Sequence, residues 1–218
     1  MFHYNTTPMK FAILTAVFVL AMSSCTATDK NSSTKTKEVM EYTRQIANPT
    51  NAKRPQYLIK VTQSGKELGE ILLELCPDIA PKHVANFEKL VADGSYNGTA
   101  FHRVIPNFMI QGGDPNSKNK PRNTWGMGDP SQTTVPAEFN ATHHGRGILS
   151  AARTPDPNSA TSQFFICVAD AGFLDRQYTV YGEVLKGMDI ADKIVNSPRD
   201  GGDNPLEKIE MNISKISK

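Results

Sequence analysis

The chain has 218 residues, and its 24 basic and 22 acidic residues leave a formal net charge of only +2 at pH 7. This near balance gives no support for nucleic acid as a partner. Hydrophobic residues make up 39%, and 15 glycines and 14 prolines favour a turn-rich globular β protein over a helical bundle. Three cysteines are too few for a disulfide scaffold.

Residues 1–24 predict a signal peptide. Lys10 precedes an apolar run over residues 11–22, which suits a secretory signal and is shorter than the roughly 20 residues of a spanning helix. Two serines then lead into Cys25, an arrangement that resembles a bacterial lipoprotein signal. The resemblance implies that Cys25 is acylated and that the protein is a periplasm-facing or surface lipoprotein of the bacterial cell envelope. An ordinary secretory signal, with Cys25 incidental, is the alternative, and Met9 is a more natural start than Met1.

Residues 25–53 predict a polar tether, because they are rich in Thr, Ser, Asn and Lys and have few apolar side chains to bury. Four apolar residues could form one short helical face: Val39, Met40, Tyr42 and Ile46. A solvated tether would let the domain predicted for residues 54–218 stand off the membrane.

The predicted domain begins with a β-hairpin. Two alternating segments, residues 57–62 and 69–75, flank a turn at residues 64–66. Pro81 then opens a helix that ends near Asp93. The apolar face of this helix consists of Val84, Phe87, Leu90 and Val91.

The rest of the chain continues with short strands. Strands are predicted at residues 101–105, 108–111, 147–152, 162–168, 178–184 and 209–216, and a second helix at residues 188–195. Residues 114–135 are rich in Pro and Gly and predict a long loop. Many strands, two helices and no alternation of strand and helix predict a closed antiparallel barrel.

Residues 101–115, FHRVIPNFMIQGGDP, combine apolar residues with one guanidinium (Arg103), one imidazole (His102) and one amide (Gln111). Pro106 cannot donate to a strand ladder, so the extended pattern bends there. The stretch has no nucleophile, carboxylate pair or metal-ligand cluster, which makes it a poor hydrolase site. It could instead hold an apolar, neutral group against a fixed guanidinium.

A second stretch, SQFFICVA at residues 162–169, has the same character. Together with FHR at 101–103 and FMIQGGD at 108–114, it closely resembles the cyclophilin family of peptidyl-prolyl isomerases over about residues 55–213. The resemblance implies an eight-stranded barrel capped by two helices, with the working groove outside. It also implies an isomerase for X-Pro bonds that assists protein folding, binds proline-containing segments and needs no cofactor or metal. We expect a monomer.

The resemblance implies a role for each matching residue. Arg103 would be the catalytic hydrogen-bond donor. The substrate-binding residues would be His102, Phe108, Met109, Gln111, Ala152, Arg153, Gln163, Phe165, Phe173, Leu174 and Tyr178.

Three of these positions depart from the common eukaryotic pattern. Phe173 stands where many members have Trp, Tyr178 where they have His, and Arg153 where Asn is common. The Trp indole N–H bonds the inhibitor cyclosporin in the family, so the resemblance implies an active isomerase with weak cyclosporin sensitivity. Position 153 contacts peptide through its backbone in the family, so the change to Arg should leave function intact.

Other interpretations remain from the residues alone. An arginine on a strand is usually a solvated surface residue, and only the joint motif favours a site. The alternative function is a non-catalytic module that binds proline-containing segments as a chaperone or scaffold, although a pure binder would not need Arg103. Adjacent His143 and His144 could suggest a metal, but adjacent residues on an extended chain point apart. Whether Cys76 and Cys167 form a disulfide cannot be decided without distances.

Overall fold

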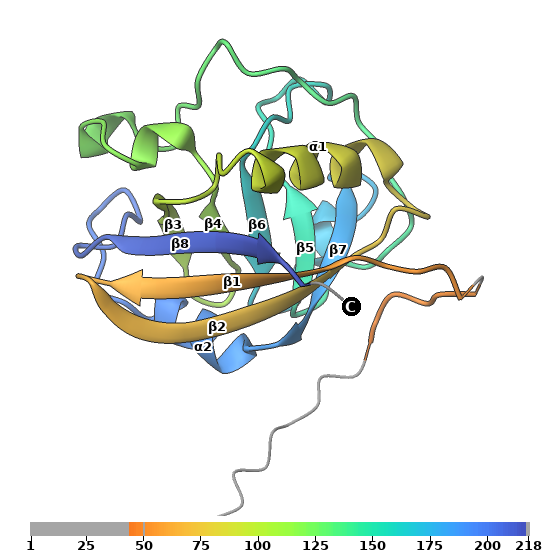
Figure 1. Ribbon diagram of the computed structural model, residues 1–218, viewed down its shortest axis with the longest axis horizontal. Helices are drawn as coiled ribbons and strands as arrows, with labels where there is room; N and C mark the ends of the chain where they lie inside the picture. Colours follow the sequence, from red (N-terminus) through yellow and green to blue (C-terminus); the bar gives the residue numbers. More distant parts are fainter. Residues whose placement is uncertain (1–43, 50, 217–218) are drawn as a thin grey trace, which may run out of the picture. The chain divides into compact units, whose positions relative to one another are not determined.

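The computed structural model describes residues 44–49 and 51–216. The predicted signal peptide, Cys25 and most of the predicted tether lie outside these residues. Within them, eight antiparallel strands close into a barrel in the order β1-β2-β7-β5-β6-β4-β3-β8 (Figure 1). The strands are β1 (Gln56–Gln63), β2 (Lys66–Leu75), β3 (Thr99–Ile105), β4 (Met109–Gly112), β5 (Ile148–Ala151), β6 (Phe164–Cys167), β7 (Val180–Lys186) and β8 (Ile209–Lys215).

Two helices close the barrel, α1 (Pro81–Ala92) and α2 (Met188–Val195), and they lie at its opposite ends (Figure 1). Three short 3-10 turns occur in the connections: η1 (Pro115–Ser117), η2 (Arg122–Thr124) and η3 (Gly172–Leu174). The prediction of a closed antiparallel barrel capped by two helices is confirmed. Two strands start two residues later than predicted, β6 at Phe164 and β7 at Val180. Before β7, the backbone N–H of Tyr178 donates to the Leu174 carbonyl and completes a turn.

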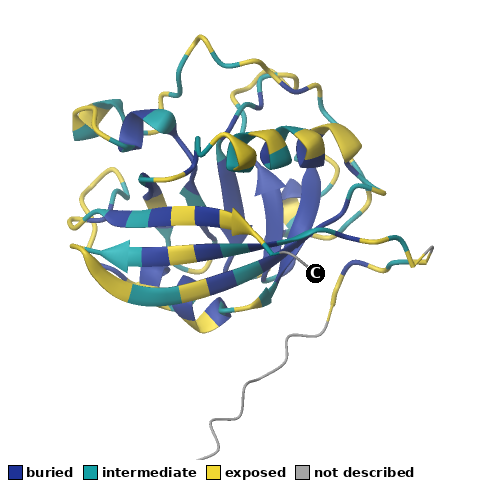
Figure 2. Cartoon of the chain, in the orientation of Figure 1, coloured by how far each residue is buried: buried dark blue, intermediate teal, exposed yellow. Residues whose placement is uncertain are grey.

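Alternate residues of the strands fill the barrel interior. Ile110 of β4 pairs with Val104 on one side and with Ile166 on the other, and Ile166 pairs with Leu149 of β5. All four side chains are fully buried and belong to the main hydrophobic core. The same alternation is visible as buried and exposed bands along β1 and β8 (Figure 2). Because the interior is packed, a binding groove must lie on the outer surface.

The intervening positions form a second row on the outside of the barrel. Arg103 of β3 pairs with Gln111 of β4, Gln111 pairs with Phe165 of β6, and Phe165 pairs with Ser150 of β5. Directly opposed residues in antiparallel strands share one face of the sheet. Residues far apart in sequence therefore meet on one outer face.

The segment before β1 packs onto the barrel, which differs from the predicted solvated tether. Ile46 is 5% exposed and belongs to a small buried cluster with Cys76, Ile148 and Val180. It lies in an irregular bend and not in a helix, and the other residues of the proposed helical face are outside the described part of the chain.

Buried charges hold this segment in place. The backbone N–H groups of Gln45 and Ile46 donate to the carboxylate of Glu183, which is fully buried in β7. The Arg54 guanidinium donates to the Ile46 and Ala47 carbonyls and to Asp78. Burial raises the pKa of Glu183. Glu183 lies more than a hundred positions after Gln45 and Ile46 in the chain, so local composition could not predict this contact.

Cys76 and Cys167 are free, buried thiols. Burial raises the pKa of each to about 12, so both remain protonated at neutral pH. Neither described helix is long or apolar enough to cross a membrane.

Candidate functional site

The paired residues Arg103, Gln111, Phe165 and Ser150 on the outside of the barrel are called the outer row, and Arg103 lies at one end of it. Its neighbours Phe101, His102 and Val104 are buried, which fixes the backbone of β3, while Arg103 itself is exposed. Within the described residues, its guanidinium has no hydrogen-bond or ion-pair partner. A guanidinium carries five N–H donors on a planar group. The barrel therefore presents a charged donor on its surface that its own carboxylates do not neutralise.

Beside Arg103 lies an apolar patch, which we call the outer cluster. It consists of the buried residues Met109, Phe165, Cys167, Ala171 and Leu174, with Ile105, Phe108, Ala152 and Tyr178 packed against it. The edge of the Tyr178 ring meets Phe165 at a centroid distance of 5.8 Å. The structure thus brings together the predicted pocket residues of β4, β6 and η3, which range from Met109 to Leu174 in the chain.

Phe173 forms the exposed rim of this patch. Its side chain is 66% exposed, and its ring centroid lies 5.3 Å from that of Phe108. This contact extends the apolar surface outward. A phenylalanine offers an apolar face at this rim and no hydrogen-bond donor.

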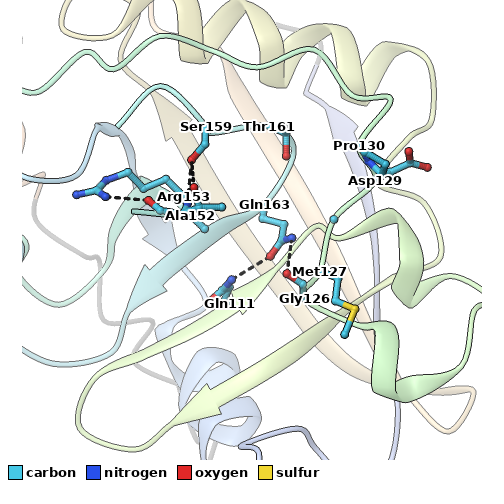
Figure 3. Close-up of a pocket in the computed structure, with 12 residues that line it drawn as sticks. Gln111, Gly126, Met127, Asp129, Pro130, Ala152, Arg153, Ser159, Thr161 and Gln163 are labelled. Carbon is cyan, nitrogen blue, oxygen red and sulfur yellow. Dashed lines mark hydrogen bonds between the residues drawn. The ribbon is translucent and has the colours of Figure 1, made fainter. Parts of the chain in front are cut away.

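Two side-chain amides, those of Gln111 in the outer row and Gln163, are hydrogen-bonded to each other. Gln111 donates through Nε2 to Oε1 of Gln163 at 3.0 Å, and Gln163 donates to the Gly126 carbonyl at 3.1 Å (Figure 3). These amides are fixed relative to one another. They border a hollow of about 230 Å³ that Ala152, Arg153 and Met127 also line.

His102 occupies a different environment from the other predicted residues. It is 4% exposed, and neither ring nitrogen has a hydrogen-bond partner in the described part of the chain. Its ring packs beneath Gly126, where an added Cβ would lie 3.3 Å from Cδ2. Burial lowers the pKa of His102, so the ring is neutral at pH 7. It supports the groove from below and has almost no surface of its own.

The sequence placed Asp114 at the start of a predicted long loop and did not indicate its structural role. It is fully buried, and Oδ1 accepts from the backbone N–H of Asn116 at 3.0 Å. Its other oxygen accepts from the backbone N–H groups of Gly126 and Gly128. The carboxylate therefore holds the glycine loop that carries the acceptor for Gln163. An aspartate followed by Pro and later by a Gly-x-Gly loop was the available signal.

The side chain of Arg153 contacts neighbouring residues of the protein. Its guanidinium carbon lies 4.4 Å from the centroid of the Tyr178 ring, and its nitrogens donate to the Gln177 and Thr154 carbonyls. This is a cation–π pair between two of the three departures from the common family pattern. Tyr178 packs against the outer cluster and Arg153 lines the hollow, so the pair links the two.

Comparison with known proteins agrees with this geometry. The family model described as "Cyclophilin type peptidyl-prolyl cis-trans isomerase/CLD" matches residues 58–216. The chain belongs to the cyclophilin family. A "Probable peptidyl-prolyl cis-trans isomerase" of Brucella suis is 51% identical over 130 residues, which cover 58% of this chain and 66% of that protein. A "Peptidyl-prolyl cis-trans isomerase" of Acinetobacter baylyi is 48% identical over 141 residues, covering 60% and 69%.

Solved cyclophilin structures have the same fold. The crystal structure of a Cryptosporidium parvum cyclophilin-type isomerase matches with a TM-score of 0.67 and 29% identity, over 76% of this chain and 99% of that one. A second crystal structure of that cyclophilin, determined in the presence of the dipeptide Ala-Pro, matches with a TM-score of 0.65 and 30% identity. The matched region spans about two thirds of the length of the Brucella protein.

Proposed function

We propose that this cyclophilin is a peptidyl-prolyl cis-trans isomerase that accelerates rotation about X-Pro bonds. The observation that carries the proposal is the exposed guanidinium of Arg103, which lies beside the outer cluster and has no hydrogen-bond or ion-pair partner in residues 44–49 and 51–216. Family membership and the names of the bacterial relatives support it. The Ala-Pro dipeptide used with the Cryptosporidium protein supports proline-containing peptides as the ligand class.

The chemistry requires little more than a well-placed donor. An X-Pro bond resists rotation because the nitrogen lone pair is delocalised into the carbonyl, with a barrier of about 18–20 kcal/mol. When the bond twists, the lone pair returns to a pyramidal nitrogen, which becomes a hydrogen-bond acceptor. A donor aimed at that nitrogen binds the twisted form better than either planar form, and such differential binding lowers the barrier.

Arg103 is the donor in this proposal. The prolyl ring sits on the outer cluster, where Met109, Phe165 and Leu174 exclude water and strengthen the field of the guanidinium. Gln111 and Gln163 hold the peptide backbone beside it. Uncatalysed exchange takes tens to hundreds of seconds, so millisecond turnover means removing about 7 kcal/mol, at 1.36 kcal/mol per tenfold. Rotation breaks no σ bond, so no nucleophile or titrating base takes part.

We further propose that the protein works in the bacterial cell envelope as a lipoprotein acylated at Cys25. The apolar run before this cysteine supports the proposal. Residues 44–49 dock onto the barrel, so the predicted tether would have to lie before Arg44. Proline-containing segments of folding envelope proteins would be the substrates.

Exchange spectroscopy on a short blocked Ala-Pro peptide tests the isomerase proposal. Catalytic amounts of the purified domain should produce cis–trans exchange peaks in proportion to protein concentration. A domain that binds the peptide without accelerating exchange would instead be a proline-binding module. If the domain neither binds the peptide nor accelerates its exchange, both proposed functions lose their basis.

A further inference from the structure

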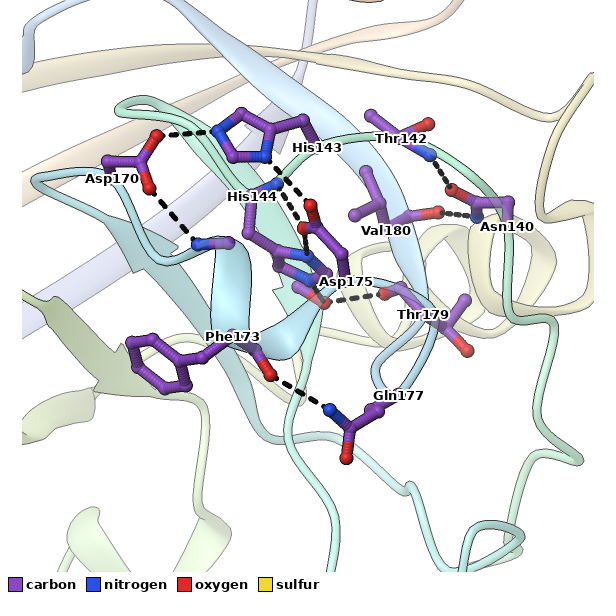
Figure 4. A network of polar contacts seen from close by, with 12 residues as sticks. Asn140, Thr142, His143, His144, Asp170, Phe173, Asp175, Gln177, Thr179 and Val180 are labelled. Atoms are coloured by element: carbon purple, nitrogen blue, oxygen red, sulfur yellow. Dashed lines mark hydrogen bonds and ion pairs between the residues drawn. The ribbon is translucent and has the colours of Figure 1, made fainter.

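The 3-10 turn η3 forms one side of the outer cluster and is held at both ends by one histidine (Figure 4). Asp170 precedes the turn, and Asp175 ends it. Nε2 of His143 lies 2.5 Å from Oδ2 of Asp170, and Nδ1 lies 2.8 Å from Oδ2 of Asp175. An ionised carboxylate can only accept hydrogen bonds, and a neutral imidazole has one N–H. Both contacts are therefore satisfied together only when His143 is an imidazolium.

The turn is fitted closely to this ring. A Cβ added at Gly172 would lie 3.0 Å from Cε1 of His143, so the ring rests against the turn backbone. The N–H of Ala171, at the start of the turn, donates to the His144 carbonyl at 2.9 Å. The N–H of His144 donates to Oδ1 of Asp175 at 2.8 Å. Ionic and backbone contacts thus attach η3 to residues 143–144.

The same network reaches the outer cluster from behind. Nδ1 of the buried His144 lies 2.9 Å from Oδ1 of Asp175, and its ring stacks on Phe165 at a centroid distance of 6.2 Å. Leu174, within η3, is 7% exposed and packs in the outer cluster. Asp175 therefore connects the half-exposed His143 to two side chains on which the prolyl ring would rest. Sequence reasoning placed the two adjacent rings on opposite sides of the chain, but both contact one carboxylate because its two oxygens accept separately.

We propose that protonated His143 is a positioning residue for the isomerase: it clamps η3 against the outer cluster, and loss of its proton loosens this side of the prolyl site. The inference rests on the proposed function, because it concerns the same pocket. His143 does not touch the substrate. It acts through Asp175 and the turn that carries Leu174.

The charges around the ring set the pH range of the effect. The hydrogen bonds that the His143 ring donates to Asp175 and Asp170 raise its pKa above the ordinary value of 6.5. The clamp is therefore complete below that value and is lost as the pH rises through the pKa of the folded protein.

The other titratable groups facing this site are His144 and the thiol of Cys167. Burial lowers the pKa of His144, and burial raises that of Cys167 to about 12. Both are neutral between pH 7 and 9, while the two aspartates remain ionised. A change in catalysis or peptide affinity between pH 7 and 9 therefore reports the loss of the His143 proton.

The test is the pH dependence of catalysis on a blocked peptide that has no titrating group. For the wild type, kcat/KM should fall by about two- to fivefold as His143 loses its proton, the size expected for a half-exposed ion pair, with most of the change in KM. His143→Gln should give the lower value at every pH from 6 to 9. Asp170→Asn should keep the transition but move its midpoint to lower pH, whereas Asp200→Asn, on a distant loop, should leave the midpoint unchanged.

Two readouts separate this inference from the proposed function. The ¹⁵N shifts of the His143 ring show directly where it titrates, and the affinity for the dipeptide Ala-Pro can be followed by chemical shifts over the same range. If the wild type is catalytically inactive, the isomerase proposal fails, and the pH dependence of the dipeptide affinity alone tests the His143 clamp. An affinity and a kcat/KM that stay flat through the measured titration of His143 would overturn the clamp. Equal values for the wild type and His143→Gln at pH 6.5, or no dipeptide binding at any pH, would also overturn it.

Discussion

Removing the carboxylate of Asp114 should destabilise the protein and loosen the groove together. Asp114→Ala leaves three backbone N–H groups without an acceptor, those of Asn116, Gly126 and Gly128. The first is buried, and losing its partner costs about 1–3 kcal/mol. The other two are partly accessible to water and add less, about 0.5 kcal/mol each. The free energy of unfolding should therefore fall by about 2–4 kcal/mol.

Urea denaturation of the domain, analysed by linear extrapolation, measures this loss. Asp129→Ala is a matched control, because Asp129 lies on the same loop and its carboxylate accepts from Ser131 at the surface; it should cost less than about 1 kcal/mol. The peptide KM should rise in Asp114→Ala, since the Gly126 carbonyl that fixes Gln163 is no longer held. If the two variants are equally stable, the buried carboxylate does not organise the loop and the reasoning is refuted.

Three further predictions concern other parts of the chain. Ile46→Ala should lower the stability of the domain by about 2 kcal/mol in thermal denaturation, because the side chain is buried against the barrel; an unchanged melting temperature would mean that the segment does not dock. Phe173→Trp, alone and with Tyr178→His, should tighten cyclosporin inhibition by about five- to a hundredfold, the effect of one recovered hydrogen bond, without a matching gain in turnover. Cys25→Ser should move the protein from the detergent phase to the soluble fraction or leave the precursor uncleaved, and a mature N-terminus elsewhere without lipid would contradict acylation.

The barrel could be predicted because its signals are local. Alternation along β1, β2 and β8, a proline at the start of α1 and turn residues between the segments each act within a few positions. The outer row was predictable only as a family resemblance. No local pattern states that Arg103, Gln111 and Phe165 are register partners, although the register explains why they meet.

The features that sequence reasoning missed depend on distant partners. Glu183 holds the backbone of Gln45, 138 positions earlier, and Asp175 holds His143, 32 positions earlier. The sequence around a single buried carboxylate in a strand, or around a pair of histidines in a loop, does not predict which residue it contacts. Such contacts fix where segments dock, and only three-dimensional structure supplies them.

In the proposed mechanism, the guanidinium of Arg103 lowers the barrier to rotation. Comparing exchange rates with peptide affinities in Arg103 variants tests this most directly. Arg103→Ala should reduce kcat/KM by about a hundredfold or more, which is about 2.7 kcal/mol, while peptide affinity falls much less. Arg103→Lys should recover little, because an ammonium lacks the planar array of donors. Near-normal catalysis of exchange by Arg103→Ala, at the peptide affinity of the wild type, would contradict the mechanism.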